Sequence, residues 1–428
     1  METNRRKFIG TALVSGLSAA LPLSSRAKAG AEDVTNRRSE SLNPHYARLD
    51  KILAQPVLKK ILFTTPVIIQ TLELLRFNDD FLCRVRSKDG AEGLSVGNSQ
   101  QLKSLYPIFV HRLQPFFIGK DARNLDTLLE EVYVYGSNYK LQSLALWVPL
   151  ATIEFAILDM LGKIAGKPMG QLIGEIYNPR VAVYSANSDR NISVEETMDR
   201  IHKQVEESQA KAIKLKVGGR MSAPETPPGR TEKLIPTVRK TYGDKMVLYA
   251  DSNGSYSVEE AIKIGRIMED NQYAFYEEPV PFDWYEETKQ VADALTIPIA
   301  GGEQEASLHA FRWLIANNAL DIVQPDMFYF GGMIRSIKVA RMAEALGKIC
   351  TPHISGEDLG YIYMMHFISA IPNAGPFHEF KGFDNGLPAT SSTSSLKSEN
   401  GIFKVPTGPG LGVEIDIAYI QKHKVVKG

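Results

Sequence analysis

Four short apolar stretches follow one another between residues 212 and 303: AIKLKV (212–217), MVLYAD (246–251), AFYEE (274–278) and IPIAGGE (297–303). The pattern extends outward in both directions, to VAVYSA (181–186), DIVQPD (321–326), KICTPH (348–353) and PFHEF (376–380). Amphipathic runs of helical length, such as 257–269 and 333–346, lie between these stretches. Short apolar strands that alternate with helices are typical of parallel βα units.

Two architectures use such units, an open doubly wound sheet and a closed (β/α) barrel. An open sheet that binds a nucleotide would carry a glycine-rich turn after its first strand. That position reads Ser185-Ala186-Asn187-Ser188, without the GxGxxG pattern. We therefore predict an α/β fold of the barrel type for this part of the chain.

The region before the barrel has a different pattern. Residues 67–98 read as antiparallel strands, with a tight turn at Phe77-Asn78-Asp79-Asp80. Apolar residues at helical spacing predict a helix over 149–165, which Gly166, Lys167 and Pro168 end. Residues 60–175 thus read as an α+β unit.

The first residues, METNRRKFIGTALVSGLSAALPLSSRAKAG, read as an export signal. A basic start with adjacent Arg5 and Arg6 precedes an apolar run, and Ala27-Lys28-Ala29 suits cleavage before Gly30. The paired arginines resemble a twin-arginine signal. The apolar run of 15 residues is too short for a membrane anchor. No later segment has about 18 uninterrupted apolar residues, so we expect an exported, periplasmic protein without a membrane anchor after cleavage.

Composition narrows the class of protein further. Lys and Arg total 49 and Asp and Glu total 49, so there is no basic surplus of the kind a nucleic-acid binder needs. The two cysteines, Cys83 and Cys350, are too few for a disulfide framework or a CxxC metal site, and we expect two buried free thiols. The partner we expect is a small molecule.

Charged residues follow the ends of six consecutive strands. They are Asp251, Glu277, Glu303, Asp326, His353 and Glu379, and successive members are 26, 26, 23, 27 and 26 residues apart. Each step is one βα unit, and the carboxyl ends of barrel strands form the active-site rim. One such residue alone could be a helix cap, but six in phase predict a shared site.

Three of the six are carboxylates on consecutive strands. Asp251, Glu277 and Glu303 would repel one another without a cation between them. Oxygen ligands favour Mg²⁺, with Mn²⁺ next, whereas Zn²⁺ would prefer nitrogen or sulfur. Glu278 follows Glu277 directly, so we expect it to point to the other side of the strand, where it would either support the metal ligands from behind or form an ion pair with a helix.

Two further groups are candidate bases. Lys214 and Lys216 lie two residues apart on one face of an otherwise apolar strand, where like charges would lower each other's pKa. A lysine tuned in this way can act as a general base, although a solvated edge strand would carry the same pattern. His353 and Asp326 end neighbouring strands, and a carboxylate that holds one imidazole nitrogen makes the other a stronger base.

These residues in this order resemble the enolase superfamily, and within it the mandelate racemase/muconate lactonizing enzyme family and its mandelate racemase-like group. The matching motifs are KLK (214–216), Asp251-Ser-Asn253, Glu277-Glu278-Pro279, Gly302-Glu303, Asp326 with Gly331-Gly332, His353 and Glu379. The stretch PLATIEFAILDMLGKIAGKPMGQLIG (149–174) and the tail VPTGPGLGVEID (405–416) match as well.

The resemblance implies a modified TIM barrel, (β/α)₇β, with an N-terminal α+β capping domain that the C-terminal segment completes. The expected division is a signal peptide over 1–29, a linker and extension over 30–59, the cap over 60–175, the barrel over 176–400 and a returning segment over 401–428. By the same resemblance, Asp251, Glu277 and Glu303 bind Mg²⁺. Lys216 is the base on one face, assisted by Lys214, and His353 with Asp326 is the base on the other. Glu379 hydrogen-bonds the substrate carboxylate.

The chemistry expected is removal of the proton α to a carboxylate, which gives an enediolate that needs fixed positive charge nearby. The leading hypothesis is a Mg²⁺-dependent dehydratase of a sugar acid or related α-hydroxy acid. A racemase, epimerase or cycloisomerase would use the same residues. A non-catalytic periplasmic binder of acid sugars is a hypothesis of another class. We expect a homo-oligomer, and we expect the short turn at 77–80 to leave closure of the site to residues 219–230, to 97–103 or to a neighbouring subunit.

Overall fold

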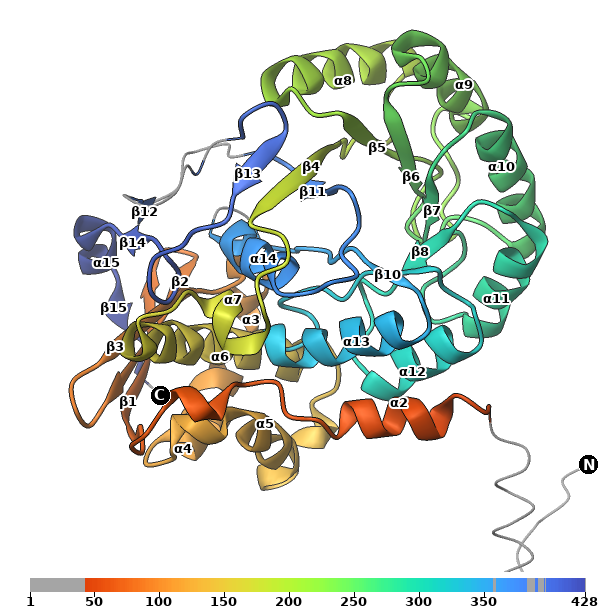
Figure 1. Ribbon diagram of the computed structural model, residues 1–428. Helices are drawn as coiled ribbons and strands as arrows, with labels where there is room; N and C mark the ends of the chain where they lie inside the picture. Colours follow the sequence, from red (N-terminus) through yellow and green to blue (C-terminus); the bar gives the residue numbers. More distant parts are fainter. Residues whose placement is uncertain (1–42, 357–358, 383–388, 392–395, 397, 428) are drawn as a thin grey trace, which may run out of the picture. The chain divides into compact units, whose positions relative to one another are not determined.

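The predicted parallel strands form one curled sheet in the computed structural model (Figure 1). The order of its parallel strands is β10-β9-β8-β7-β6-β5-β4-β11, and β13 (Ile402–Lys404) pairs with β4 in the antiparallel sense. The parallel strands are β4 (Arg180–Ala186), β5 (Ala212–Lys216), β6 (Val247–Asp251), β7 (Phe275–Glu277), β8 (Ile299–Gly301), β9 (Ile322–Val323), β10 (Ile349–Cys350) and β11 (His378–Phe380).

One helix follows each of the first seven of these strands, and Figure 1 shows these helices outside the ring of strands. They are α8 (Val194–Ser208), α9 (Arg230–Tyr242), α10 (Val258–Asp270), α11 (Tyr285–Ala294), α12 (Leu308–Ala316), α13 (Met333–Ala345) and α14 (Gly360–Ser369). The segment before β11 bridges β10 at Cys350 and Ala374, which brings the two edges of the sheet together. The predicted (β/α)₇β barrel is confirmed.

A second, antiparallel sheet precedes the barrel and has the order β15-β1-β2-β3. Its strands are β1 (Ile69–Phe77), β2 (Asp80–Ser87), β3 (Glu92–Val96) and β15 (Lys424–Val425). Phe77 pairs with Asp80, so the turn between β1 and β2 holds two residues, as predicted. Because β15 comes from the end of the chain and pairs with β1, the C-terminal segment does return to the cap.

The cap also contains helices. They are α3 (Ser99–Ile108), the π-helical turn η2 (Phe109–Leu113), α4 (Gln114–Phe117), α5 (Leu125–Val134), α6 (Leu144–Ala165) and α7 (Met169–Ile173), with the 3₁₀ turns η1 (Lys60–Leu62), η3 (Ala122–Asn124) and η4 (Tyr135–Lys140). Of these, α3, η2, α4 and α6 contact the small sheet. The tail adds β12 (Ala389–Thr390), which pairs with β14 (Glu414–Ile415), and α15 (Ile417–Lys422).

The structure describes residues 43–356, 359–382, 389–391, 396 and 398–427. The predicted export signal and residues 30–42 of the predicted linker and extension lie outside these residues. Within the expected extension, the sequence analysis missed the helix α2 (Tyr46–Leu53), which packs on α12 and α13. The guanidinium of Arg312 on α12 lies 4.3 Å from the ring centre of Tyr46, a cation–π contact that helps hold α2 in place.

The central helix of the cap is α6, and it anchors the cap to the barrel. Its Glu154 is fully buried and accepts hydrogen bonds from the backbone nitrogens of Met333 (2.6 Å) and Ile334 (2.9 Å), in the first turn of α13. Gly332 precedes that turn with a φ of 106°, and a Cβ there would lie 1.9 Å from the Glu154 carboxylate. The glycine pair at 331–332 is thus required by a close approach of cap and barrel.

A second buried carboxylate on α6 binds the tail. Asp159 accepts hydrogen bonds from the backbone nitrogens of Leu94 in β3 and Leu411 in the tail, both at 2.8 Å. A Cβ at Gly410 would lie 2.1 Å from Asp159 Oδ1, so only glycine allows this approach. The tail motif around 405–416 is therefore explained by its contact with α6.

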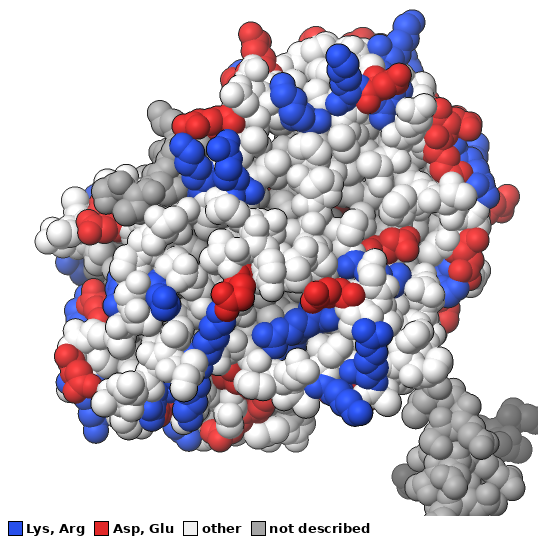
Figure 2. All heavy atoms as spheres, in the orientation of Figure 1, with Lys and Arg blue, Asp and Glu red and all other residues white. Residues whose placement is uncertain are grey.

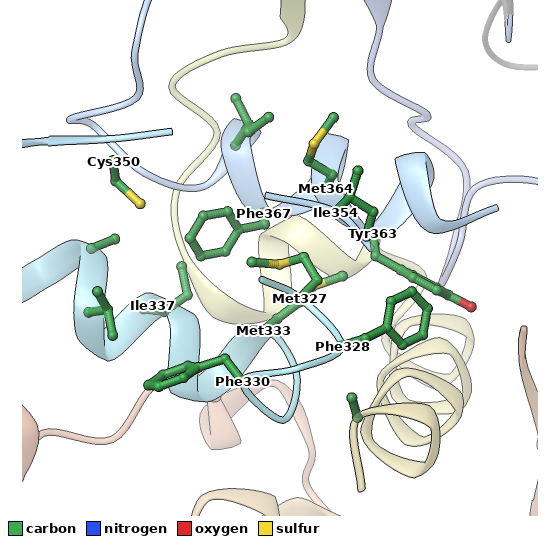
Figure 3. Close-up of a cluster of buried hydrophobic side chains, with 14 of the residues drawn as sticks. Met327, Phe328, Phe330, Met333, Ile337, Cys350, Ile354, Tyr363, Met364 and Phe367 are labelled. Carbon is green, nitrogen blue, oxygen red and sulfur yellow. The ribbon is translucent and has the colours of Figure 1, made fainter. Parts of the chain in front are cut away.

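The segment after β9 is held by a buried hydrophobic cluster (Figure 3). Figure 3 shows Phe328 and Phe330 from this segment beside side chains of α13 and α14. The ring of Tyr363 on α14 lies 6.0 Å from that of Phe328 and stacks at 4.0 Å on Phe155 of α6. The Tyr363 hydroxyl also accepts a hydrogen bond from the Val96 backbone nitrogen at 2.8 Å. This packing fixes the segment that starts at Asp326 against both the cap and the barrel.

By length and composition α6 could cross a membrane. The sequence predicted a helix here, over 149–165, but it was not identified there as a possible membrane span. It is the one such helix in the described part of the chain, and 89% of that stretch is buried inside the protein. Burial of this kind is typical of a core helix. On the face shown in Figure 2, blue and red side chains are interspersed, in keeping with the equal numbers of basic and acidic residues.

Candidate active site

Strand register brings three of the predicted site residues into one row. Lys216 of β5 pairs with Asp251 of β6, and Asp251 pairs with Glu277 of β7. Neighbours in a parallel sheet point to the same face, which here is the barrel interior. The Lys216 ammonium forms an ion pair with Asp251. Burial would raise the pKa of Asp251, but Lys216 and Lys214 hold it below its usual range.

Lys214 lies two residues before Lys216 on the same face of β5, deeper in the barrel, and it is fully buried. Its Nζ atom donates to both carboxylate oxygens of Glu277, at 2.9 and 3.0 Å, and lies 3.5 Å from Glu379. Burial would lower the pKa of Lys214, but Glu277 and Glu379 hold it well above its usual range. The expectation that the two lysines lower each other's pKa is therefore wrong for Lys214, because its nearest charged neighbours are carboxylates.

The three predicted metal ligands converge. Asp251, Glu277 and Glu303 are buried, and each offers an oxygen within 4.8 Å of those of the other two. Burial raises the pKa of Glu277 to about 7 against the opposing charge of Lys214, and Asp251 adds to the rise. The Oε2 atom of Glu303 is buried and accepts no hydrogen bond among the described residues, although His353 Nε2 lies 3.3 Å from it. Three buried carboxylates that converge in this way could hold a metal ion.

Of the two roles expected for Glu278, its contacts fit support of the metal ligands, through an amide that Glu278 shares with Glu303. The φ of 43° at Glu278 is left-handed, which turns the chain at the end of β7. The side chain is buried, and its Oε2 lies 3.3 Å from the Asn253 amide, which also donates to Glu303. Burial and the charge of Glu303 raise the pKa of Glu278. The simple alternation of strand faces fails here because the strand ends one residue earlier.

The histidine and its carboxylate also meet. His353 Nδ1 lies 2.6 Å from Asp326 Oδ2, and the other oxygen of Asp326 accepts from the backbone nitrogens of Phe328 and Tyr329, both at 2.7 Å. His353 Nε2 lies 3.3 Å from Glu303 and 3.3 Å from Glu379. Burial would lower the pKa of His353, but these two carboxylates raise it.

Glu379 lies between the histidine and the deeper lysine. It is almost fully buried, and Lys381 is 3.8 Å away. Burial would raise the pKa of Glu379, but Lys214, Lys381 and His353 hold it below its usual range, so it is a carboxylate. All eight predicted site residues thus lie in one connected cluster at the carboxyl ends of the barrel strands.

Two segments from outside the barrel strands approach this cluster. The loop 217–229 after β5 is hydrogen-bonded to the end of β6, through Met221 N to Asn253 O and Ser222 N to Gly254 O, both at 2.9 Å. From the cap, Asn98 donates to Ser355 at 3.0 Å, and Ser355 donates to Asp326 at 3.0 Å. The side chains of Lys216 and His353 are only 11% and 10% exposed, which favours a site completed by other segments over an open mouth.

Sequence reasoning missed two cations at this site. Arg190 and Arg220 each lie four residues beyond the last residue of a strand, β4 and β5, and each donates to the side-chain oxygen of Asn253. Their equal spacing from the strand ends was the available signal. Gln324 of the segment after β9 was also missed, and it donates to Glu277 at 2.9 Å.

The comparisons with known proteins agree with this geometry. Residues 196–419 match the enolase C-terminal domain-like family, and residues 78–174 match the N-terminal domain of mandelate racemase/muconate lactonizing enzymes. The arabinonate dehydratase of Saccharolobus solfataricus is 26% identical over 342 residues, which cover 79% of this chain and 89% of that protein.

Solved structures are similar over most of the chain. A mandelate racemase/muconate lactonizing protein from Paracoccus denitrificans, complexed with magnesium, has a TM-score of 0.75 and 26% identity, and the match covers 84% of this chain and 99% of that one. The 3,6-anhydro-D-galactonate cycloisomerase of Zobellia galactanivorans has a TM-score of 0.69 and 26% identity, with 85% and 100% covered. The chain belongs to the mandelate racemase/muconate lactonizing enzyme family of the enolase superfamily, and it is an enzyme of the dehydratase or racemase type.

Proposed function

We propose that this protein is a Mg²⁺-dependent dehydratase of a sugar acid or a related α-hydroxy acid. The proposal rests on one observation above all. The two candidate bases contact different carboxylates of the triad: Lys216 forms an ion pair with Asp251, and His353 lies beside Glu303. A substrate held at the triad would therefore meet a proton-transferring group on each of two faces.

The triad suits a hard divalent cation. Its donors are buried carboxylate oxygens that lie within 4.8 Å of one another. Asp251, Glu277 and Glu303 would hold Mg²⁺, in line with the magnesium complex of the Paracoccus relative. Bound there, Mg²⁺ would supply positive charge beside the substrate carboxylate.

The remaining residues divide the work of proton transfer and charge stabilisation. Lys214 supplies a fixed positive charge deep in the site, since Glu277 and Glu379 keep it protonated. Asp326 holds His353 at Nδ1, which leaves Nε2 facing the site. In a dehydration, one base takes the proton α to the carboxylate and the group on the other face gives a proton to the departing β-hydroxyl. One water leaves, and the enol product becomes a keto acid.

The decisive experiment is incubation of the Mg²⁺-loaded protein with a panel of acid sugars in D₂O. Formation of a keto acid supports the dehydratase. Deuterium exchange or a changed configuration without loss of water would instead indicate a racemase or epimerase, and ring opening would indicate a cycloisomerase, the activity of the Zobellia relative. Binding with neither exchange nor product would leave only a non-catalytic binder. Lys216→Met is the control, because it removes one base and leaves the carboxylates.

We also propose that the protein acts outside the cytoplasm. Arg5, Arg6 and the apolar run after them support export, and a periplasmic location would give the enzyme access to acid sugars before uptake.

A further inference from the structure

Three cationic groups converge on one neutral oxygen beside the carboxylate triad. The Oδ1 atom of Asn253 accepts from Arg190 Nη2 at 2.7 Å, from Lys216 Nζ at 3.1 Å and from Arg220 Nη2 at 3.4 Å. Lys216 is also paired with the Asp251 carboxylate, but no carboxylate forms an ion pair with Arg190 or Arg220 within the described residues. An amide oxygen has two lone pairs and no charge, so Asn253 cannot neutralise the two guanidinium groups. The two guanidinium groups thus have more donors than this oxygen can accept.

The hydrogen bonding of Arg190 is also incomplete. Its Nε atom is buried and has no hydrogen-bond partner within the described residues. Besides Asn253, its guanidinium donates within the described residues only to the Asp251 backbone oxygen, in a long contact of 3.3 Å. Buried guanidinium groups are ordinarily satisfied by planar acceptors.

Arg230, which lies nearby, is an arginine with a structural role, and its hydrogen bonding differs from that of Arg190. Its Nε donates to Ile192 O, its Nη1 to Lys216 O and its Nη2 to Asp189 O, all at 3.0 Å. Arg230 therefore holds the loops after β4 and β5 in place, with its donors in use. Arg190 belongs to one of these loops and Arg220 to the other, which places both at the carboxyl ends of neighbouring strands (Figure 1).

We propose that Arg190 and Arg220 form a subsite for a second anionic group of the substrate. This inference rests on the proposed function, and it narrows the substrate to an acid sugar with two anionic groups. One is the carboxylate beside the triad. The other is a second carboxylate, or a sulfate or phosphate ester, that lies on the Lys216 side of the site. Either kind of group offers several oxygens to two guanidinium groups. Arg220 is exposed, so the second anionic group lies toward the solvent side of the subsite.

The test compares matched ligands on the Mg²⁺-loaded full-length protein. Galactonate carries one anionic group, galactarate carries two carboxylates, and galactonate 6-sulfate carries a carboxylate and an ester. Binding is measured by calorimetry and turnover by keto-acid formation, for the wild type, Arg190→Gln, Arg220→Gln and the control Arg200→Gln. Arg200 is a suitable control because it is an exposed arginine of α8 that pairs with Asp189.

We expect the wild type to bind at least one of the dianions about tenfold or more tightly than galactonate, since a charge-assisted pair contributes roughly that much. Arg190→Gln should remove most of this preference, by raising Kd and KM for the dianion far more than for galactonate, and Arg200→Gln should keep it. Which dianion is preferred distinguishes the carboxylate from the ester.

Two results would overturn the subsite. One is equal or better binding of galactonate by the wild type. The other is a preference for a dianion that survives both Arg190→Gln and Arg220→Gln. Binding that depends on the arginines, without turnover of any ligand, would contradict the dehydratase but support the subsite. The experiment therefore tests the two proposals independently.

Discussion

The imidazole Nδ1 of His353 lies 2.6 Å from Asp326 Oδ2, while Asp326 Oδ1 accepts hydrogen bonds from two backbone nitrogens and from Ser355. These hydrogen bonds orient the Asp326 carboxylate, and the carboxylate in turn orients the imidazole. We predict that Asp326→Asn lowers kcat by about 10²- to 10⁴-fold, the range of a general acid–base contribution, because the amide can no longer hold the proper tautomer.

The amide of Asp326→Asn keeps an oxygen for the backbone nitrogens of Phe328 and Tyr329, so the fold should be retained. Steady-state kinetics and a thermal melt check both points. Ser355→Ala removes one hydrogen bond to the same carboxylate and should have a smaller effect. Unchanged turnover in Asp326→Asn would contradict the role given to the pair.

Metal binding should stabilise the protein through the triad. With Mg²⁺ at about 100 times its Kd, the free energy of unfolding should rise by about 2.7 kcal/mol over the metal-free protein. Glu303→Gln should lose most of this gain, because an amide is a poorer ligand than a carboxylate. Thermal or urea unfolding with and without EDTA measures this gain in stability. Glu259→Gln is the control, because Glu259 is an exposed residue of α10. A full gain in Glu303→Gln would exclude it as a ligand.

The loop 217–229 should matter for catalysis more than for metal binding. It is docked on Asn253 and Gly254 and carries Arg220 at the site. Deletion of residues 221–228 should leave Mg²⁺ binding intact and lower kcat/KM severely. The deletion also removes Glu225, whose side chain accepts from Thr231 N in the first turn of α9, so a loss of about 1 kcal/mol in stability is expected. If kinetics on the true substrate stay unchanged, the loop is only a surface insertion.

Stability should fall in mild acid because of His366. This residue of α14 is fully buried, its Nε2 lies 2.9 Å from Leu411 O, and burial lowers its pKa to about 4. The unfolded chain takes up a proton near pH 6.5 that the folded protein resists. The stabilising contribution is therefore complete above pH 6.5 and is lost as the pH falls toward 4, by about 3 kcal/mol in total.

His366→Gln keeps a donor for Leu411 but cannot gain a charge, so its stability should change less between pH 7 and pH 4.5. Urea unfolding midpoints of the variant and the wild type measure the difference, with the exposed change His202→Gln as the control. Parallel pH profiles for His366→Gln and the wild type would contradict the assignment.

Export should depend on both leading arginines. The double change Arg5→Lys and Arg6→Lys keeps the charge but should leave the protein in the cytoplasmic fraction, because a twin-arginine signal requires the guanidinium pair. Arg26→Lys, in the same leader, should still be exported. Periplasmic recovery of the double variant would contradict a twin-arginine signal and indicate export by another kind of signal.

The sequence by itself determined the barrel and most of the candidate site. The length and apolarity of each strand are local properties, and a charged residue at the end of a strand can be read from spacing alone. Parallel strands in a closed sheet bring their carboxyl ends together, so Asp251, Glu277 and Glu303 had to meet. The turn after Phe77 was also determined locally, because the two predicted strands are too close in the sequence for a longer connection than two residues.

Only the tertiary structure decided how these groups affect one another. The pKa of Lys214 rises because Glu277 and Glu379, distant in the sequence, lie against it. Glu278 turns toward the site because its backbone is left-handed, which no strand periodicity encodes. Arg190 and Arg220 meet at Asn253 because the loops after β4 and β5 fold over the same strand end. Such contacts depend on long-range register and loop packing, so the spacing of residues along one chain could not specify them.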